Sequence, residues 1–420
     1  MSILNYIQTR KKIESSKNVD ILWYIALLFF LLLVVTLQSL AKNNVISISN
    51  FYIPDSYTYE LRLLGIKDIE NEGLAAQAYN ILNKFLYSLG SHSFFIFNAS
   101  LLFLSINICR DVFRYISSRA ISYARLAIVA NPYLLIGAVG PNKETILIFL
   151  CLLFWKFFFK PDSRSRIIIL TIIATAPIFI RPIVSFPLYV CIFIYPLIKN
   201  KYNKPRAFII AFLGFFFLLN SIPFTKSLIS SLYADDNISS FATSRIYDIS
   251  LLLKNYSQDI ILQYPAFVAK SVIFLFAPIV RPLTIFESPL PLLDVGYSWV
   301  AFLLFPFNLS LTLASFPFWR TSNKQFSVYQ SMIFFYSLLS IVVIILNPIL
   351  TFRYIFPFTP FVFACFALQS IKVRNYIIYF SIVIILISVW LSVWLSMIYN
   401  YNIEGGVSTI EAIPEFLQWL

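Results

Sequence analysis

The chain has 420 residues, of which 59% are hydrophobic, 18% aromatic and only 12% charged. Because a soluble globular domain has about 25% charged residues, this composition excludes one and predicts a polytopic, all-α integral membrane protein. The net charge of +13 does not indicate a nucleic-acid partner, because the basic residues are concentrated in short loops that set membrane orientation.

Eleven apolar stretches are long enough, or nearly long enough, to cross a bilayer as helices. The polar stretches between them are too short for a separate soluble domain, so residues 1–420 are predicted to form one transmembrane domain. The polar start of the chain and the absence of a small-residue cleavage site predict that the first span is an uncleaved anchor. The predicted spans lie near residues 21–41, 92–109, 120–140, 144–161, 166–182, 183–198, 207–225, 294–317, 328–349, 355–371 and 376–399.

Basic residues follow an alternating pattern along these spans. If the N-terminus is cytoplasmic, the cytoplasmic segments contain most of the 32 lysines and arginines, as topology rules require. The sequence therefore predicts a cytoplasmic N-terminus and, after eleven spans, a periplasmic C-terminus. The predicted cytoplasmic segments are 1–20, 109–126, 156–166, 199–206, 320–324 and 372–374.

Two longer segments, about 42–91 and 226–293, face the periplasm in this topology. In the first, AAQAYNILNKFLYSLG at 75–90 predicts an amphipathic helix that lies on the membrane face. In the second, SVIFLFAPIVRPL at 271–283 is apolar for only about a dozen residues and is interrupted by prolines, so it is expected to be re-entrant or interfacial.

The residue types exclude several kinds of chemistry. His92 is the single histidine, so a histidine-based metal site, a Ser-His triad and a haem pair lack ligands, and no metal or cofactor is expected. The cysteines lie inside or at the ends of apolar segments, where they are interpreted as packing residues. They are Cys109, Cys151, Cys191 and Cys365.

Three arginines stand at the outer ends of apolar spans: Arg181 in FIRPIV, Arg281 in PIVRPL and Arg353 in TFRYIF. None has an acidic residue within five positions. An arginine in hydrocarbon costs about 3 kcal/mol or more, so these side chains are expected to face the protein interior, with a ligand as counter-charge. Lys143 belongs to the same cationic set, and Arg245 is a further candidate from the second outer segment.

A cationic cluster at the outer leaflet suits the phosphate or diphosphate group of a lipid, because arginine binds phosphate through two N–H groups and lysine acts as a point charge. A carboxylate beside it can take a proton from a sugar hydroxyl. The acidic residues predicted at this face are Asp55 and Glu60 in FYIPDSYTYE, Glu144 in GPNKET and Glu287 in FESPLP.

Each residue also has a simpler interpretation that the sequence leaves open. Arg181 and Arg281 precede prolines at helix ends, where arginine often extends to the membrane interface. Lys143 and Glu144 can pair with each other or cap the hairpin between two spans. Asp55 is equally typical of a turn.

These motifs resemble those of the type C glycosyltransferase superfamily, polytopic membrane enzymes that use polyprenyl-linked sugars. The superfamily includes or resembles bacterial repeat-unit polymerases of O-antigen and capsule clusters. Asp55 lacks the adjacent acid that is usual there, which leaves the choice of base open. The matching features are Asp55 in a long first outer loop, the hairpin NPYLLIGAVGPNKETILIF with Lys143 and Glu144, and the TFRYIFPFTP element with Arg353 and Tyr354.

The resemblance implies an enzyme that polymerises oligosaccharide repeat units on undecaprenyl diphosphate, at the periplasmic face of a bacterial inner membrane, for lipopolysaccharide O-antigen, capsule or exopolysaccharide. It implies no cofactor, and as partners the lipid-linked glycans, the bilayer, a chain-length regulator and a flippase. The implied catalytic residues are Asp55, Glu144 and Glu60, and the implied diphosphate-binding residues are Lys143, Arg181, Arg281, Arg353, Tyr354 and Arg245.

Three alternatives remain open at the level of sequence. One is a type C transferase that moves a single sugar from a polyprenyl-phosphate donor. Another is a lipid-linked oligosaccharide flippase or other transporter, although transporters usually show repeated halves and helices broken at mid-membrane. The third is a purely structural or assembly role.

Overall fold

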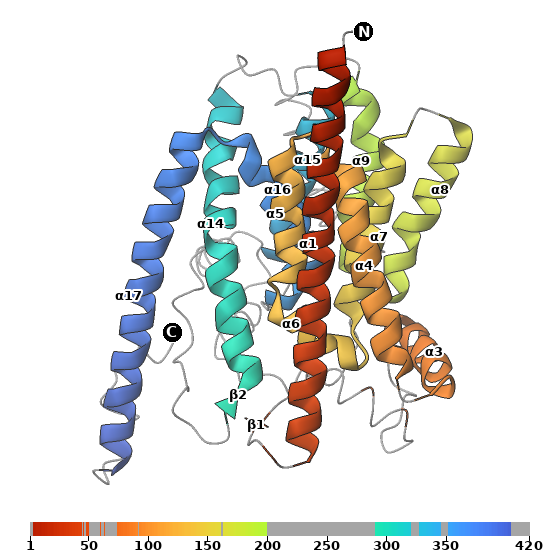
Figure 1. Cartoon of the computed structure of the whole chain (residues 1–420). Helices are drawn as coiled ribbons and strands as arrows, with labels where there is room; N and C mark the ends of the chain where they lie inside the picture. Colours follow the sequence, from red (N-terminus) through yellow and green to blue (C-terminus); the bar gives the residue numbers. More distant parts are fainter. Residues whose placement is uncertain are drawn as a thin grey trace, which may run out of the picture.

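The computed structural model describes residues 3–43, 74–90, 92–160, 163–199, 290–320, 327–345 and 352–404, with isolated positions at 45, 48–49, 59 and 63. The described part consists of helices that run roughly side by side, with one pair of very short strands (Figure 1). This confirms the all-α prediction. The re-entrant interpretation of 271–283 and the predicted span 207–225 lie outside the described residues.

Most described helices begin and end close to the predicted spans, but α1 begins well before the span predicted at 21–41, and the span predicted at 120–140 is divided into two helices. The bounds are α1 Ile3–Lys42, α3 Leu74–Ser88, α4 Ser93–Phe113, α5 Ser118–Val129, α6 Pro132–Ile136, η1 Gly137–Val139, α7 Lys143–Phe158, α8 Arg164–Thr175, η2 Ala176–Phe179, α9 Pro182–Lys199, α14 Leu292–Arg320, α15 Val328–Ile345, η5 Phe352–Phe358, α16 Thr359–Cys365, η6 Phe366–Leu368 and α17 Ile371–Glu404. The η elements are 3₁₀ turns that extend or introduce an α-helix.

Polar caps define where several helices start. Ser117, Asn131, Asn142 and Ser163 each accept a hydrogen bond from a backbone N–H in the first turn of the helix that follows. These N–H groups have no partner within their own helix, so a side-chain oxygen in front of the first turn stabilises the start. Each apolar run is therefore limited by a residue that the sequence places at its edge.

Three helical segments of the described residues are long and apolar enough to cross a membrane: Asp20–Ala41, Ser93–Phe113 and Ile371–Leu391. A fourth is added if Ser118–Val129 and Pro132–Val139, bent by 52°, form one span. The bend falls at Asn131 and Pro132, where proline cannot continue the helix of α5. Shorter apolar helices accompany these segments, and the total of eleven spans stays a prediction.

The connections alternate between the two ends of the bundle (Figure 1). We call the end where α1 begins the N-terminal end; the loops after α4, α7 and α16–η6 also lie there, whereas α3, β1 and β2 lie at the opposite end. Most of the described basic residues lie at or near the N-terminal end, in line with the alternating pattern in the sequence. They include Arg110, Arg114, Arg119, Lys156, Lys160, Arg164 and Lys372.

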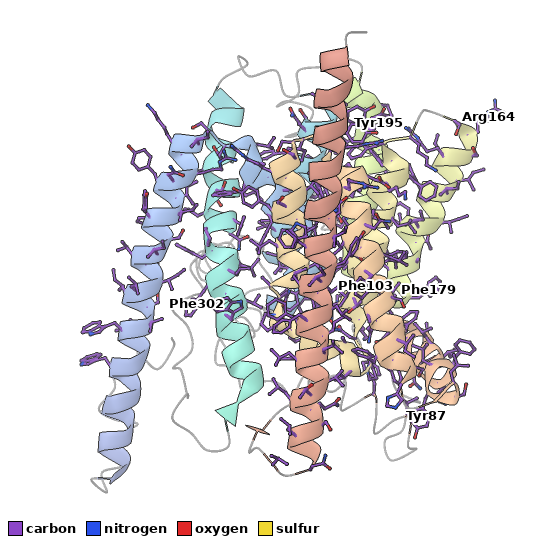
Figure 2. The ribbon with its side chains drawn as sticks, viewed as in Figure 1. Tyr87, Phe103, Arg164, Phe179, Tyr195 and Phe302 are labelled. Atoms are coloured by element: carbon purple, nitrogen blue, oxygen red, sulfur yellow. The ribbon has the colours of Figure 1, made fainter. Side chains whose placement is uncertain are left out.

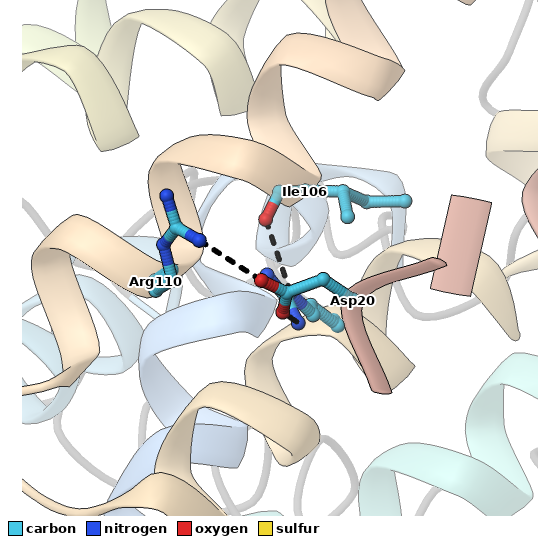
Figure 3. A network of polar contacts seen from close by, with 4 residues as sticks. Asp20, Ile106 and Arg110 are labelled. Carbon is cyan, nitrogen blue, oxygen red and sulfur yellow. Dashed lines mark hydrogen bonds and ion pairs between the residues drawn. The ribbon is translucent and has the colours of Figure 1, made fainter. Parts of the chain in front are cut away.

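Asp20 fixes α1 to the bundle at this end (Figure 3). One carboxylate oxygen lies 2.5 Å from Nη1 of Arg125, and the other accepts a hydrogen bond of 3.0 Å from Nη1 of Arg110. Arg125 is only 2% exposed and donates from Nε to the carbonyl of Ile106 at 3.1 Å. The group thus joins α1, α4 and α5.

Aromatic side chains fill the centre, where α16 packs between α5 and α15. The Phe307 and Phe363 rings are stacked with centroids 3.6 Å apart, and Trp155 packs against Tyr336 at 5.2 Å. Tyr133 on α6 meets Phe356 on η5 at 5.0 Å. This last contact holds η5 next to the α6–α7 hairpin. All four cysteines are buried and unpaired, as predicted.

The described parts of the two predicted outer segments lie at the opposite end. The amphipathic helix of the first is confirmed as α3, whose buried face carries Tyr79 and Asn83 and whose exposed face carries Ile81 and Phe85. Strands β1 (Ile48–Ser49) and β2 (Leu290–Pro291) pair in parallel and join the first outer segment to the end of the second. The two segments therefore meet although they are far apart in sequence.

Candidate functional site

The α6–α7 hairpin places Lys143 and Glu144 at the opposite end of the bundle. Asn142 caps α7 by accepting a hydrogen bond of 3.0 Å from the Glu144 N–H. From inside α4, the Asn98 amide donates to the carbonyls of Ala138 at 3.2 Å and Gly140 at 2.9 Å. A buried amide therefore fixes the backbone of the turn that presents the two charged side chains.

Lys143 lies against two tyrosines. Its Nζ is 4.7 Å from the ring centroid of Tyr59 and 5.1 Å from that of Tyr79, and the two rings meet edge to face at 4.9 Å. Cation–π contacts of this kind help to hold an ammonium group in place. The ammonium of Lys143 is thus oriented at the junction of the hairpin, the first outer segment and α3.

Glu144 and Arg181 form a buried ion pair. Nη2 of Arg181 donates to Oε1 of Glu144 at 2.7 Å, and the side chains are only 7% and 4% exposed. The guanidinium also lies over the ring of Tyr354, with Cζ 4.3 Å from the centroid. Arg181 stands at the junction of η2 and α9, directly before Pro182. Its counter-charge comes from within the chain, although the sequence offers no acid within five positions.

Three sequence motifs thus meet in one place, which we call the hairpin cluster. The charged pair on the hairpin, the arginine before α9 and the tyrosine of TFRYIF come from α7, the η2–α9 junction and η5. Of the two open interpretations of Lys143 and Glu144, capping and mutual pairing, the structure shows Glu144 paired with Arg181 instead. The hairpin cluster consists of Lys143, Glu144, Arg181, Tyr354, Tyr59 and Tyr79.

Several predicted site residues are not placed with the cluster. Arg353 lies in η5, next to Tyr354, but its side chain is not among those described. The remaining candidates lie outside the described residues; they are Asp55, Glu60, Arg245, Arg281 and Glu287. In the part of the chain that the structure covers, no group of three or more His, Cys, Asp or Glu side chains is placed to hold a metal ion.

Two contributors do not stand out in the sequence. Tyr79 is predicted only as part of an amphipathic helix, although it contacts Lys143. Asn98 lies near the start of an apolar span. Its signal in the sequence is that a buried amide in such a span needs hydrogen-bond partners inside the protein.

Comparison of the chain with protein-family models, with curated proteins and with solved structures finds no match. The residues of the hairpin cluster therefore carry the functional argument. They combine an oriented ammonium, a buried carboxylate held by a guanidinium and aromatic rings at one end of a membrane bundle. Such a set can bind an anion and accept a proton.

Proposed function

We propose that the chain is a membrane glycosyltransferase that polymerises oligosaccharide repeat units carried on undecaprenyl diphosphate. Its product would be an O-antigen, capsule or exopolysaccharide, made at the periplasmic face of a bacterial inner membrane. The observation that carries the proposal is the meeting of Lys143, Glu144, Arg181 and Tyr354 at the end of the bundle opposite the basic loops. The resemblance of the same motifs to type C glycosyltransferases supports it.

In the proposed reaction, a hydroxyl oxygen of the acceptor sugar forms a bond to the anomeric carbon of the donor glycan. The bond between that carbon and the diphosphate oxygen breaks, and its electrons stay on the diphosphate. The hydroxyl proton passes to a carboxylate. Cationic groups stabilise the leaving diphosphate, an electrostatic role that requires no metal.

The geometry suggests different roles for the two cations of the cluster. Lys143 is held by two aromatic rings beside the Glu144–Arg181 pair, so it is the proposed diphosphate-binding group. Arg181 is paired with Glu144, so we propose that it orients this carboxylate. Glu144 is then the proposed base among the described acids, and Asp55 and Glu60 remain candidates for the same role.

The test is complementation in a host whose surface polysaccharide depends on this protein, with Glu144→Gln, Lys143→Ala and, as a matched control, Lys84→Ala on the exposed face of α3. Loss of a general base typically lowers the rate by about 10²- to 10⁴-fold. Gels should therefore show loss of the ladder for Glu144→Gln and shortening for Lys143→Ala, with equal protein by immunoblot and a normal ladder for the control.

Normal ladders in well-expressed Glu144→Gln and Lys143→Ala proteins would contradict the proposal. A product longer by one sugar, in place of a ladder of repeats, would select the transferase that moves a single sugar. Transport of lipid-linked glycans by purified protein in vesicles, without bond formation, would select the transporter.

A further inference from the structure

An open groove runs along the outer surface of the bundle next to the hairpin cluster. One wall is α3, with Ala78, Tyr79 and Leu82, and the other is α8 and η2, with Thr175, Ala176 and Phe179. Its volume is about 480 Å³, within the range of ligand sites. The two walls come from the first outer segment and from the helix that leads to Arg181.

The surface of the groove is apolar even where polar residues line it. Thr171 and Thr175 line it, but both hydroxyls donate to backbone carbonyls one turn earlier in α8, at 2.9 and 2.7 Å. Their methyl groups are therefore what a ligand meets. Because the other lining residues are almost all hydrocarbon or aromatic, the groove favours an alkyl or isoprenoid chain over a polar molecule.

The rim of the groove is exposed and apolar. Ile172 is 63% and Phe179 53% exposed, and Phe179 projects at the lower end of α8 beside α3 (Figure 2). On α3, Ile81 and Phe85 are exposed beside the groove. Large exposed apolar side chains on a membrane protein face lipid, so a lipid hydrocarbon chain can enter the groove sideways from the bilayer.

The inner end of the groove borders the charged residues of the hairpin cluster. Tyr79 lines the groove and at the same time contacts the ammonium of Lys143. Ile180, at the other wall, directly precedes Arg181. The groove and the cluster together thus offer hydrocarbon at one end and the ammonium of Lys143 at the other, which is the arrangement that an amphiphile with a phosphate head group complements.

We propose that this groove binds the hydrocarbon chain of the polyprenyl diphosphate carrier, with the diphosphate directed to Lys143. The inference rests on the proposed function for the identity of the lipid. It adds a binding location for the hydrocarbon chain of the lipid and a lateral entry for it between α3 and α8. Bulk phospholipid is the competing occupant, and the experiment separates the two.

The experiment uses the full chain in nanodiscs and a polyprenyl diphosphate with a photoreactive group in its hydrocarbon chain. Mass spectrometry maps the labelled residues. Ala176→Trp and Ala78→Trp fill the groove from opposite walls, and Ile168→Trp, at a 61% exposed position one turn beyond it, is the matched control. We expect labelling in α3 and in 171–180, a decrease of about tenfold in both groove variants, and no change in the control.

Two labelling results would overturn the inference, and so would the polymer result given last. One is labelling that stays at the wild-type level in both groove variants although they are folded. The other is equal labelling by a phosphatidylglycerol with the same photoreactive group, together with no competition from unlabelled polyprenyl diphosphate. Labelling of the groove in a protein that makes no polymer would refute the proposed function alone, and normal polymer from both groove variants would refute the groove alone.

Discussion

At the scale of single residues, the Glu144–Arg181 pair has both a structural role and a proposed chemical role. Both side chains are almost completely buried, so each requires the other as a counter-charge. Removing one partner of a buried pair typically costs about 3–5 kcal/mol because the remaining charge stays in a medium of low polarity. A residue can thus be needed for folding and for chemistry, and variants must separate the two.

Arg181→Ala and Glu144→Ala should each lower the stability of the purified protein in detergent by about 3–5 kcal/mol, whereas the double variant should lose clearly less than the sum. Thermal unfolding of the four proteins measures this coupling. Additive losses would mean that the pair at 2.7 Å contributes no interaction energy. Lys84→Ala, at an exposed position on α3, should unfold as the wild type does.

Asp20 offers a second prediction at this scale. Asp20→Ala leaves the 2% exposed Arg125 without its carboxylate, whereas Arg110→Ala removes a partner whose side chain is 53% exposed. We expect a large decrease in unfolding temperature for Asp20→Ala and almost none for Arg110→Ala, because exposed ion pairs contribute only about 0–1 kcal/mol. Equal decreases in the two variants would show that burial does not decide the effect.

At the scale of elements, the α6–α7 turn depends on one side chain from another helix. Asn98 supplies hydrogen bonds to two carbonyls of this turn, and its loss leaves buried acceptors without donors, at about 1–3 kcal/mol. Asn98→Leu should lower the unfolding temperature and shorten the polysaccharide ladder. Asn98→Gln should recover less than half of the lost unfolding temperature and less than half of the lost ladder length, because its longer side chain displaces the amide. A normal ladder in Asn98→Leu would show that polymerisation does not depend on the hydrogen bonds from Asn98 to the turn.

Small residues replace glycine in one helix contact. The main described packing partner of α17 is α14, and the buried positions of α17 form a narrow stripe of Arg374, Ile377, Ser381 and Ser388. The chain has only 9 glycines, which argues against many close helix crossings of the GxxxG type. Serine serves the same purpose here, since its small side chain lets helix backbones approach.

At the scale of the whole molecule, the alternation of basic loops predicts orientation, and the buried cysteines make it testable without prior substitutions. Cys109, Cys151, Cys191 and Cys365 are all buried, so the wild type should react slowly with a membrane-impermeant maleimide. Ser88→Cys on α3 should be labelled from the periplasm, and Ser163→Cys only after the membrane is opened. The reverse pattern would invert the topology on which the proposed periplasmic reaction depends.

Much of the helical layout could be predicted from the sequence, because apolar runs, caps and basic loops are local signals. Ser93–Phe113 and the amphipathic helix at Leu74–Ser88 are examples. The Glu144–Arg181 contact could not be predicted, since it joins residues 37 positions apart through helix packing that no local pattern encodes. The bend between α5 and α6 shows a similar limit: Pro132 is visible in the sequence, but the predicted single span at 120–140 runs through it without a bend.

Helix α17 is the last helix of the described chain. Among the described residues it packs mainly on α14, and it presents Ile382, Leu386 and a stacked, exposed Trp390–Trp394 pair outward. The described aromatic centre is built almost entirely from helices that precede α17 in the chain. Most of its contacts can therefore form while the ribosome is still synthesising α17, so we expect this helix to dock late in biogenesis.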